Sequence, residues 1–84
     1  MAHQKDGTGR DGMADVNSDV AGRVWKIIVQ PGQMVAADEP VMILESMKME
    51  IPAVSPIDGR VSEVLVSEEE MVSEDQLVAI VEPA

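Results

Sequence analysis

An internal repeat is the feature of this sequence that most restricts its fold. Residues 18–45 align without a gap on residues 55–82 when the chain is shifted by 37 positions. Eleven of the 28 aligned pairs are identical, whereas about two or three would be expected by chance in so valine-rich a chain. Identical pairs include Gly22/Gly59, Arg23/Arg60 and Met34/Met71. The repeat predicts two equivalent halves that follow one backbone course.

Each half is expected to consist of short β-strands. The chain has thirteen valines, six isoleucines and a single aromatic residue, Trp25, and β-branched residues favour strands. A short strand is predicted before Gly22 and before Gly59, and longer strands are predicted at 23–29, 41–45, 60–66 and 77–81. The Met-Val pairs at 34–35 and 71–72 are predicted to lie in loops. Neither half can bury an apolar face alone, so we predict an all-β sandwich or flattened barrel with pseudo-twofold symmetry.

The symmetry predicts where Lys48 lies. Residues 46–54 connect the halves, and the symmetry mate of Lys48 would be position 85, just beyond Ala84. Because a twofold axis places equivalent points at opposite ends, Lys48 is predicted at the tip of a hairpin, at the pole opposite the C-terminal residue.

The two halves differ in their turn chemistry. Gln30-Pro31-Gly32-Gln33 fits a type II turn, with proline second and glycine third. In the second half Glu69 takes the place of Gly32, and a positive φ there would cost about 1 kcal/mol relative to glycine. We expect a different turn at 67–70 or a locally weak segment.

Composition and charge exclude several classes of protein. The net charge of −10 repels phosphate backbones and argues against nucleic-acid binding. No segment has the length and apolarity of a membrane span or a signal peptide. The chain has no cysteine, so disulfides and thiolate metal sites are excluded. We expect a cytoplasmic protein whose domain is monomeric when isolated.

Residues 1–15 are expected to form a disordered tail, and residues 16–84 to form the single domain. Residues 1–12 are polar and rich in glycine, so they have little to bury. His3, the single histidine, lies in this tail without a second ligand type beside it, so no metal site is predicted there.

The residues with the clearest chemical meaning are 45–50, Glu-Ser-Met-Lys-Met-Glu. Two methionines flank Lys48, and both cannot easily point inward at a hairpin tip, so they are candidates for a recognition surface. A lysine amine on an exposed turn is protonated at neutral pH and is a weak nucleophile. Lys48 therefore makes more sense as an acceptor that another enzyme modifies than as a catalyst.

The segment Glu45-Ser46-Met47-Lys48-Met49 resembles the attachment motif of biotinyl domains, in which a Met-Lys-Met triplet at a hairpin tip receives biotin on its lysine. Gly22, Pro31-Gly32, Ser55-Pro56 and Gly59 also match the pattern of that family. The resemblance covers roughly residues 16–83 and is closest to free-standing, thumbless biotin carboxyl carrier proteins. It departs from the family at Ser46, where alanine is common, and at Glu69, where glycine is expected.

This resemblance implies a flattened barrel of two four-stranded antiparallel sheets and a set of partners. A biotin protein ligase would attach biotin to Lys48, with Met47 and Met49 recognised by the ligase and Glu45, Ser46 and Glu50 flanking the turn. A biotin carboxylase would load a carboxyl group, and a carboxyltransferase would receive it. The chain itself would be a non-catalytic carrier subunit with a swinging arm.

Other interpretations stay open at this stage. Lipoyl domains resemble biotinyl domains in fold, but they usually flank the lysine with Asp and Ala rather than Met47 and Met49. The same barrel also serves as an unmodified adaptor. Two thioethers suit Cu(I), yet no Cys or His accompanies them. No carboxylate pair comes with a His, a Cys or a glycine-rich loop, so an independent catalytic site is not predicted.

Overall fold

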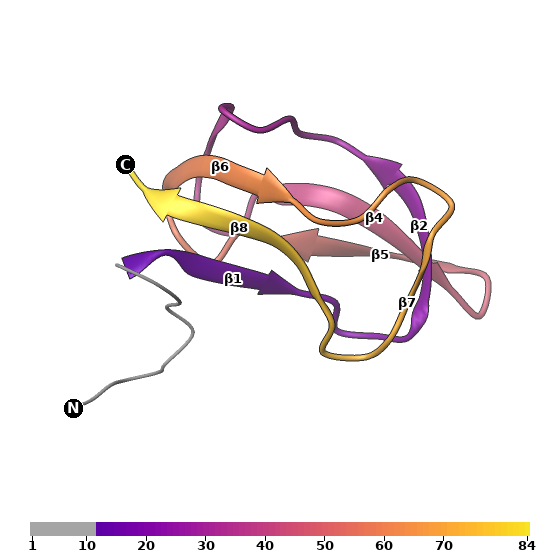
Figure 1. Ribbon diagram of the computed structural model, residues 1–84. Coiled ribbons are helices and arrows are strands. Elements are labelled where there is room, and N and C mark those ends of the chain that lie inside the picture. The colour runs from indigo at the N-terminus through magenta and orange to yellow at the C-terminus, as the bar shows by residue number, and fades with distance from the viewer. Residues whose placement is uncertain (1–11) are drawn as a thin grey trace.

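The computed structural model describes residues 12–84 and shows a two-layered β fold (Figure 1). One sheet has the strand order β1-β8-β6-β3 and the other has the order β5-β4-β2-β7, with antiparallel pairing throughout. The strands are β1 (Ala14–Asn17), β2 (Gly22–Ile27), β3 (Met34–Val35), β4 (Pro40–Ser46), β5 (Met49–Val54), β6 (Gly59–Val64), β7 (Met71–Val72) and β8 (Leu77–Pro83). Two four-stranded sheets confirm the all-β fold expected from the sequence.

The hydrogen bonds obey the predicted pseudo-twofold symmetry. The Gly32 amide donates to the Val61 carbonyl at 2.7 Å, and the equivalent Glu69 amide donates to the Val24 carbonyl at 2.7 Å. The central pair of each sheet comes from one repeat, β2 with β4 or β6 with β8. One edge strand of that sheet, β7 or β3, comes from the other repeat, and the second edge strand, β5 or β1, comes from the segment that precedes that other repeat. Neither half can therefore complete a sheet alone.

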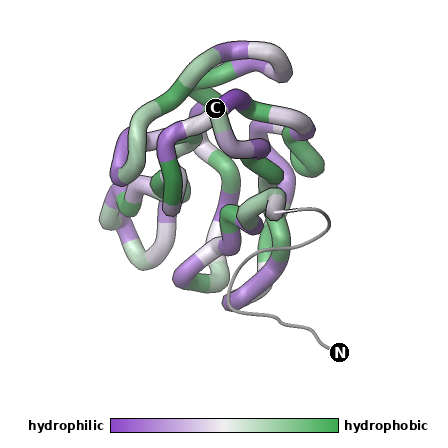
Figure 2. Tube along the Cα trace, turned by 90° about the vertical axis from the view of Figure 1, so that its left-hand side faces the viewer, coloured by the Kyte–Doolittle hydropathy of each residue, from purple (hydrophilic) through white to green (hydrophobic). Residues whose placement is uncertain are grey.

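The core lies between the two sheets and is made mostly of valine. Hydrophobic and hydrophilic stretches both occur along the chain (Figure 2), and the central strands β4 and β8 carry continuous apolar runs. Burial of these aliphatic side chains is the main favourable term for folding. The buried cluster contains Val16, Val24, Val29, Val35, Val41, Met42, Leu44, Ala53, Val61, Val66, Val72, Val78, Ala79 and Val81.

Paired β-bulges explain why the alternation in the sequence is imperfect. The register shifts between Val24 and Lys26 in β2, and between Val61 and Glu63 in β6. Trp25 and Ser62 are the extra residues, and a bulge displaces one residue from the alternating pattern. Trp25 is consequently 42% exposed, and its mate in the repeat is the small polar Ser62, so the core shared by the two halves does not require it.

Several predicted boundaries differ from the structure. β2 and β6 each end two residues before the predicted ends of 23–29 and 60–66, and the Met-Val pairs form strands β3 and β7 rather than loops. These two-residue strands carry too little pattern to be separated from a loop. The predicted boundary between residues 15 and 16 falls inside β1, since Ala14 is buried and pairs with Val81. Residues 1–11 of the predicted tail, including His3, lie outside the described residues.

The turn at Ser67–Glu70 is not different from its mate, contrary to one of our two expectations. The Glu70 amide donates to the Ser67 carbonyl at 3.1 Å, as the Gln33 amide does to the Gln30 carbonyl. Glu69 has a φ of 76° and Gly32 a φ of 94°. Glu69 thus adopts the same backbone conformation as Gly32, although it lacks the conformational freedom of glycine.

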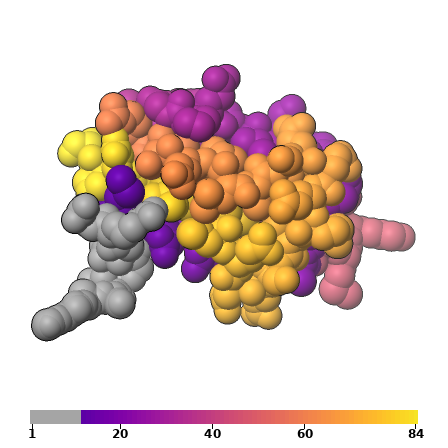
Figure 3. Space-filling model, in the orientation of Figure 1, coloured from indigo at the N-terminus to yellow at the C-terminus, as the bar shows by residue number. Residues whose placement is uncertain are grey.

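The β4–β5 hairpin extends beyond the two sheets at one pole, and the C-terminal residue lies at the other (Figure 1). The space-filling view shows the hairpin tip standing clear of the body (Figure 3). This arrangement confirms the pole predicted for residue 48 from the symmetry. Within residues 12–84, no helix is long and apolar enough to cross a membrane.

Candidate functional site

The candidate site is the two-residue turn that joins β4 to β5. Ser46 pairs with Met49 across the hairpin, so Met47 and Lys48 alone form the connection. Their φ values are 51° and 67°, and positive φ at both central residues identifies a type I′ turn. Such a turn matches the twist of the flanking strands, but it favours Asn and Gly rather than Met and Lys.

The turn displays its side chains to solvent. Met47 is 91% exposed and Met49 is 62% exposed, as expected for side chains that cannot pack inward at a tip. Lys48 is exposed, and its ammonium forms no hydrogen bond or ion pair with residues 12–84. The amine is therefore accessible to an enzyme approaching from outside.

The base of the hairpin is fixed to β2 and to the segment before it. The Ser46 hydroxyl donates to the Ala21 carbonyl at 2.9 Å, so Ser46 serves as a tether and not as a nucleophile. A Cβ on Gly22 would lie 2.4 Å from the Glu45 carbonyl oxygen, which shows how closely β2 approaches the end of β4. The exposed turn thus stands on a rigid support.

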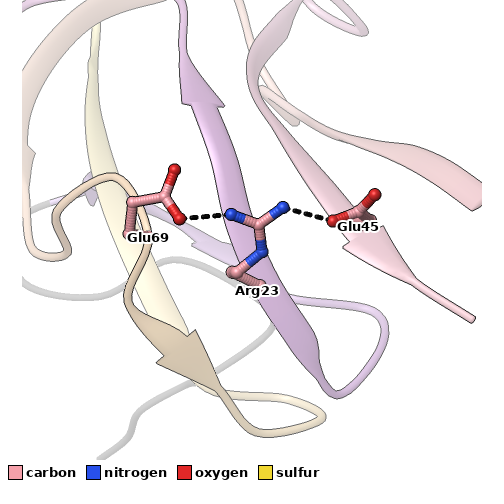
Figure 4. A network of polar contacts seen from close by, with 3 residues as sticks. All are labelled: Arg23, Glu45 and Glu69. Carbon is pink, nitrogen blue, oxygen red and sulfur yellow. Dashed lines mark hydrogen bonds and ion pairs between the residues drawn. The ribbon is translucent and has the colours of Figure 1, made fainter. Parts of the chain in front are cut away.

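Three charged side chains meet beside this base. Arg23 of β2 binds Glu45 of β4 through one guanidinium nitrogen and Glu69 through the other (Figure 4). These contacts raise the pKa of Arg23, the hydrogen bond to Glu45 having the largest effect. We call Arg23, Glu45 and Glu69 the Arg23 network. Glu50 lies opposite Glu45 in the hairpin and remains exposed.

The sequence singled out Glu45, Ser46, Met47, Lys48, Met49 and Glu50, and the structure places all six in or beside the hairpin turn. Arg23 and Glu69 were missed as site residues, because they reach the hairpin base from β2 and from the 67–70 turn. The sequence feature that could have identified Glu69 is its departure from the repeat, because the equivalent residue in the first half is Gly32.

A cavity in the surface formed by residues 12–84 lies away from this site. This cavity of about 290 Å³ lies at the opposite pole and is lined by Met34, Arg60, Glu82, Pro83 and Ala84. Substrate sites of enzymes are usually concave, whereas Lys48 stands on a projection. Within residues 12–84, no three His, Cys, Asp or Glu side chains group in a way that could hold a metal ion.

The type I′ turn gives a prediction about stability. Lys48→Gly should raise the free energy of unfolding by about 1 kcal/mol relative to Lys48→Ala, because only glycine takes the positive φ without steric cost. For a domain of this size the difference is about 4–8 °C in the unfolding midpoint. Thermal unfolding of the two variants, followed by circular dichroism, measures it. Equal midpoints would contradict a strained backbone at Lys48.

Comparisons with known proteins agree with this geometry. A family model for Biotin_lipoyl, described as "Biotin-requiring enzyme", matches residues 12–81. A "Biotin/lipoyl attachment protein" of Bacillus subtilis (strain 168) is 48% identical over 40 residues, which are 48% of this chain and 55% of that protein. The alpha subunit of mitochondrial methylcrotonoyl-CoA carboxylase from Dictyostelium discoideum is 39% identical over 51 residues, or 60% of this chain and 7% of that protein.

Solved structures show the same fold inside larger enzymes. Urea carboxylase of Kluyveromyces lactis superimposes with a TM-score of 0.82 at 30% identity, over 96% of this chain and 7% of that one. A single-chain, multi-domain long-chain acyl-CoA carboxylase gives a TM-score of 0.77 at 22% identity, over 95% of this chain and 8% of that one. The chain thus spans about half of the first relative and less than a tenth of the carboxylases.

Proposed function

Since the chain belongs to the Biotin_lipoyl family of attachment domains, we propose that it is a biotin carboxyl carrier with biotin bound to Lys48 by an amide. The family bears a covalent biotin or lipoyl group, and its attachment domains are non-catalytic. The observation that carries the proposal is the exposed Lys48 between Met47 and Met49 on a rigidly based hairpin. Homologous domains within carboxylases support the choice of biotin.

The residues at the tip and base of the β4–β5 hairpin are suited to holding a covalently bound biotin. The Nζ of Lys48 has no partner within residues 12–84. As a neutral amine it would attack an activated carboxyl group of biotin, so that the amide C–N bond forms while the bond to the activating group breaks and the nitrogen gives up a proton. The lysine stem lengthens the arm, while the Ser46 tether and the Arg23 network keep the base of that arm in place. Bound biotin supplies a ring nitrogen that accepts and releases a carboxyl group.

The chain's own contribution is reach and local concentration. A tethered group meets each partner site at an effective concentration set by the arm, which replaces diffusion of a free cofactor. The partners in this proposal are a biotin protein ligase, a biotin carboxylase and a carboxyltransferase. The acidic surface, with a net charge of −10, favours partners that have basic docking faces.

A comparison of two ligases tests the choice of cofactor. Purified protein is incubated with ATP and either biotin plus a biotin protein ligase or lipoate plus a lipoyl ligase, and the rates of mass addition are compared. We expect biotin addition to exceed lipoyl addition by about tenfold or more, a difference of roughly 1.4 kcal/mol in recognition. Faster lipoyl addition would contradict the biotin assignment and identify lipoate as the cofactor. No addition by either ligase would favour an unmodified adaptor.

A matched variant tests whether the methionines set this choice. Met47→Asp combined with Met49→Ala gives the flanks typical of lipoyl domains, and both positions are exposed, so the fold should be retained. The ratio of biotin to lipoyl addition should fall in this double variant. An unchanged ratio would show that recognition does not depend on the flanking side chains.

A further inference from the structure

The repeat provides an internal control for the ion pairs beside the hairpin. Both halves contain one arginine–glutamate pair, Arg23 with Glu45 and Arg60 with Glu82. Arg60 directs both Nε, at 2.7 Å, and a terminal nitrogen to the same oxygen of Glu82. Arg23 instead divides its guanidinium between Glu45 and a third residue, Glu69. The third residue, Glu69, comes from the second repeat and contacts the arginine that lies beside the base of the Lys48 hairpin.

Glu69 occupies a position that the fold would fill better with glycine. Its φ of 76° is close to the 94° of its mate Gly32, and a Cβ on Gly32 would meet nothing within 4 Å. An L-residue pays a steric cost for this conformation that glycine avoids. The Glu69 side chain is 71% exposed, so burial does not offset that cost. Its ion pair with Arg23 is the interaction that glycine could not make.

Arg23 connects Glu69 to the β4–β5 hairpin. Arg23 lies opposite Glu45 in the β2–β4 ladder, and Glu45 lies opposite Glu50 in the β4–β5 ladder. Like charges directly across a ladder are destabilising. The guanidinium of Arg23 beside Glu45 offsets the repulsion between Glu45 and Glu50 at the base of the turn. Glu69 holds Arg23 from the other side, as Figure 4 shows.

We propose that Glu69 is a positioning residue, which acts through Arg23 and Glu45 to hold the base of the β4–β5 hairpin in the geometry that a modifying ligase meets. Strained backbone at a residue with no packing role is a known mark of functional sites. The consequence for modification rests on the function proposed for Lys48, whereas the effect on the hairpin can be measured in unmodified protein.

Amide hydrogen exchange of residues 45–50 tests the proposal directly. In Glu69→Gly the steric cost disappears, so the unfolding midpoint should be equal to or above that of the wild type. Exchange in 45–50 should nevertheless become about two- to fivefold faster, the effect expected from loss of an exposed ion pair. The KM for biotinylation by a ligase should rise by a similar factor while kcat stays unchanged.

Two further measurements test whether Glu69 acts on the hairpin through Arg23. In an Arg23→Gln background, Glu69→Gly should cause no additional change in hairpin exchange, because coupled residues give non-additive effects. Raising the ionic strength from about 0.05 M to 1 M should reduce the difference between wild type and Glu69→Gly, since exposed pairs are screened by salt.

Equal exchange of residues 45–50 in wild type and Glu69→Gly would overturn the positioning role. Faster exchange spread evenly over all strands would also overturn it, because that pattern reports global stability. A wild-type protein that no ligase modifies would reject the proposed function, and the exchange data would still decide the role of Glu69 at the hairpin.

Discussion

Gly59→Ala is expected to lower the free energy of unfolding by about 3 kcal/mol, near the upper end of the range for overpacked sites. A Cβ at this position would lie 2.1 Å from the Glu82 carbonyl oxygen and 2.9 Å from Cγ1 of Val81. The nearest clash is with backbone, so β6 and β8 would have to move apart. For a domain of this size the unfolding midpoint should fall by at least about 12 °C.

Gly32→Ala is the matched control for this substitution. Gly32 has a positive φ but open space around its Cα, so alanine there should cost only about 1 kcal/mol. Denaturant unfolding of the two variants separates steric exclusion from backbone preference. If Gly59→Ala destabilises no more than Gly32→Ala, the close approach of β6 to β8 is not what requires glycine at 59.

The glycines illustrate what the repeat could and could not reveal. The identity of Gly22 and Gly59 is visible in the sequence, and it marks equivalent positions. Their physical reason is not visible, because each is required by a carbonyl oxygen on a neighbouring strand rather than by a turn. Such a contact joins residues more than twenty positions apart, which local pattern does not encode.

Strand pairing was likewise only partly predictable. The repeat and the abundance of β-branched residues predicted two β-rich halves, the hairpin and its pole. They did not predict that β3 would pair with β6 and β7 with β2. A two-residue strand has too few side chains to specify its partner, so the exchange of edge strands between halves depends on the assembled core.

The candidate site shows the same division between local and distant information. Lys48 and its flanking methionines are contiguous in sequence, so their pattern predicted an exposed acceptor. Glu69 reaches Arg23 across 46 positions, and the sequence suggested only a departure from glycine at that turn. Only the tertiary structure shows that Glu69 binds Arg23, because local propensities do not specify contacts between residues far apart in sequence.

Lys48→Arg is expected to abolish covalent modification completely. Arginine keeps the positive charge and the length of the side chain, but its guanidinium cannot be deprotonated in proteins and does not form the amide. The substituted side chain would project from the same exposed turn, so the fold should be unaffected. Lys26→Arg is the matched control, because Lys26 is the other lysine within residues 12–84 and is exposed on β2.

The most direct measurement is the intact mass of the protein co-expressed with a biotin protein ligase in medium supplemented with biotin. We predict one added biotinyl group in the wild type and in Lys26→Arg, and none in Lys48→Arg. An unmodified wild-type protein in cells with an active ligase would contradict the biotin carrier assignment. A biotinyl group that persists in Lys48→Arg would contradict the placement of the attachment site at the tip of the β4–β5 hairpin.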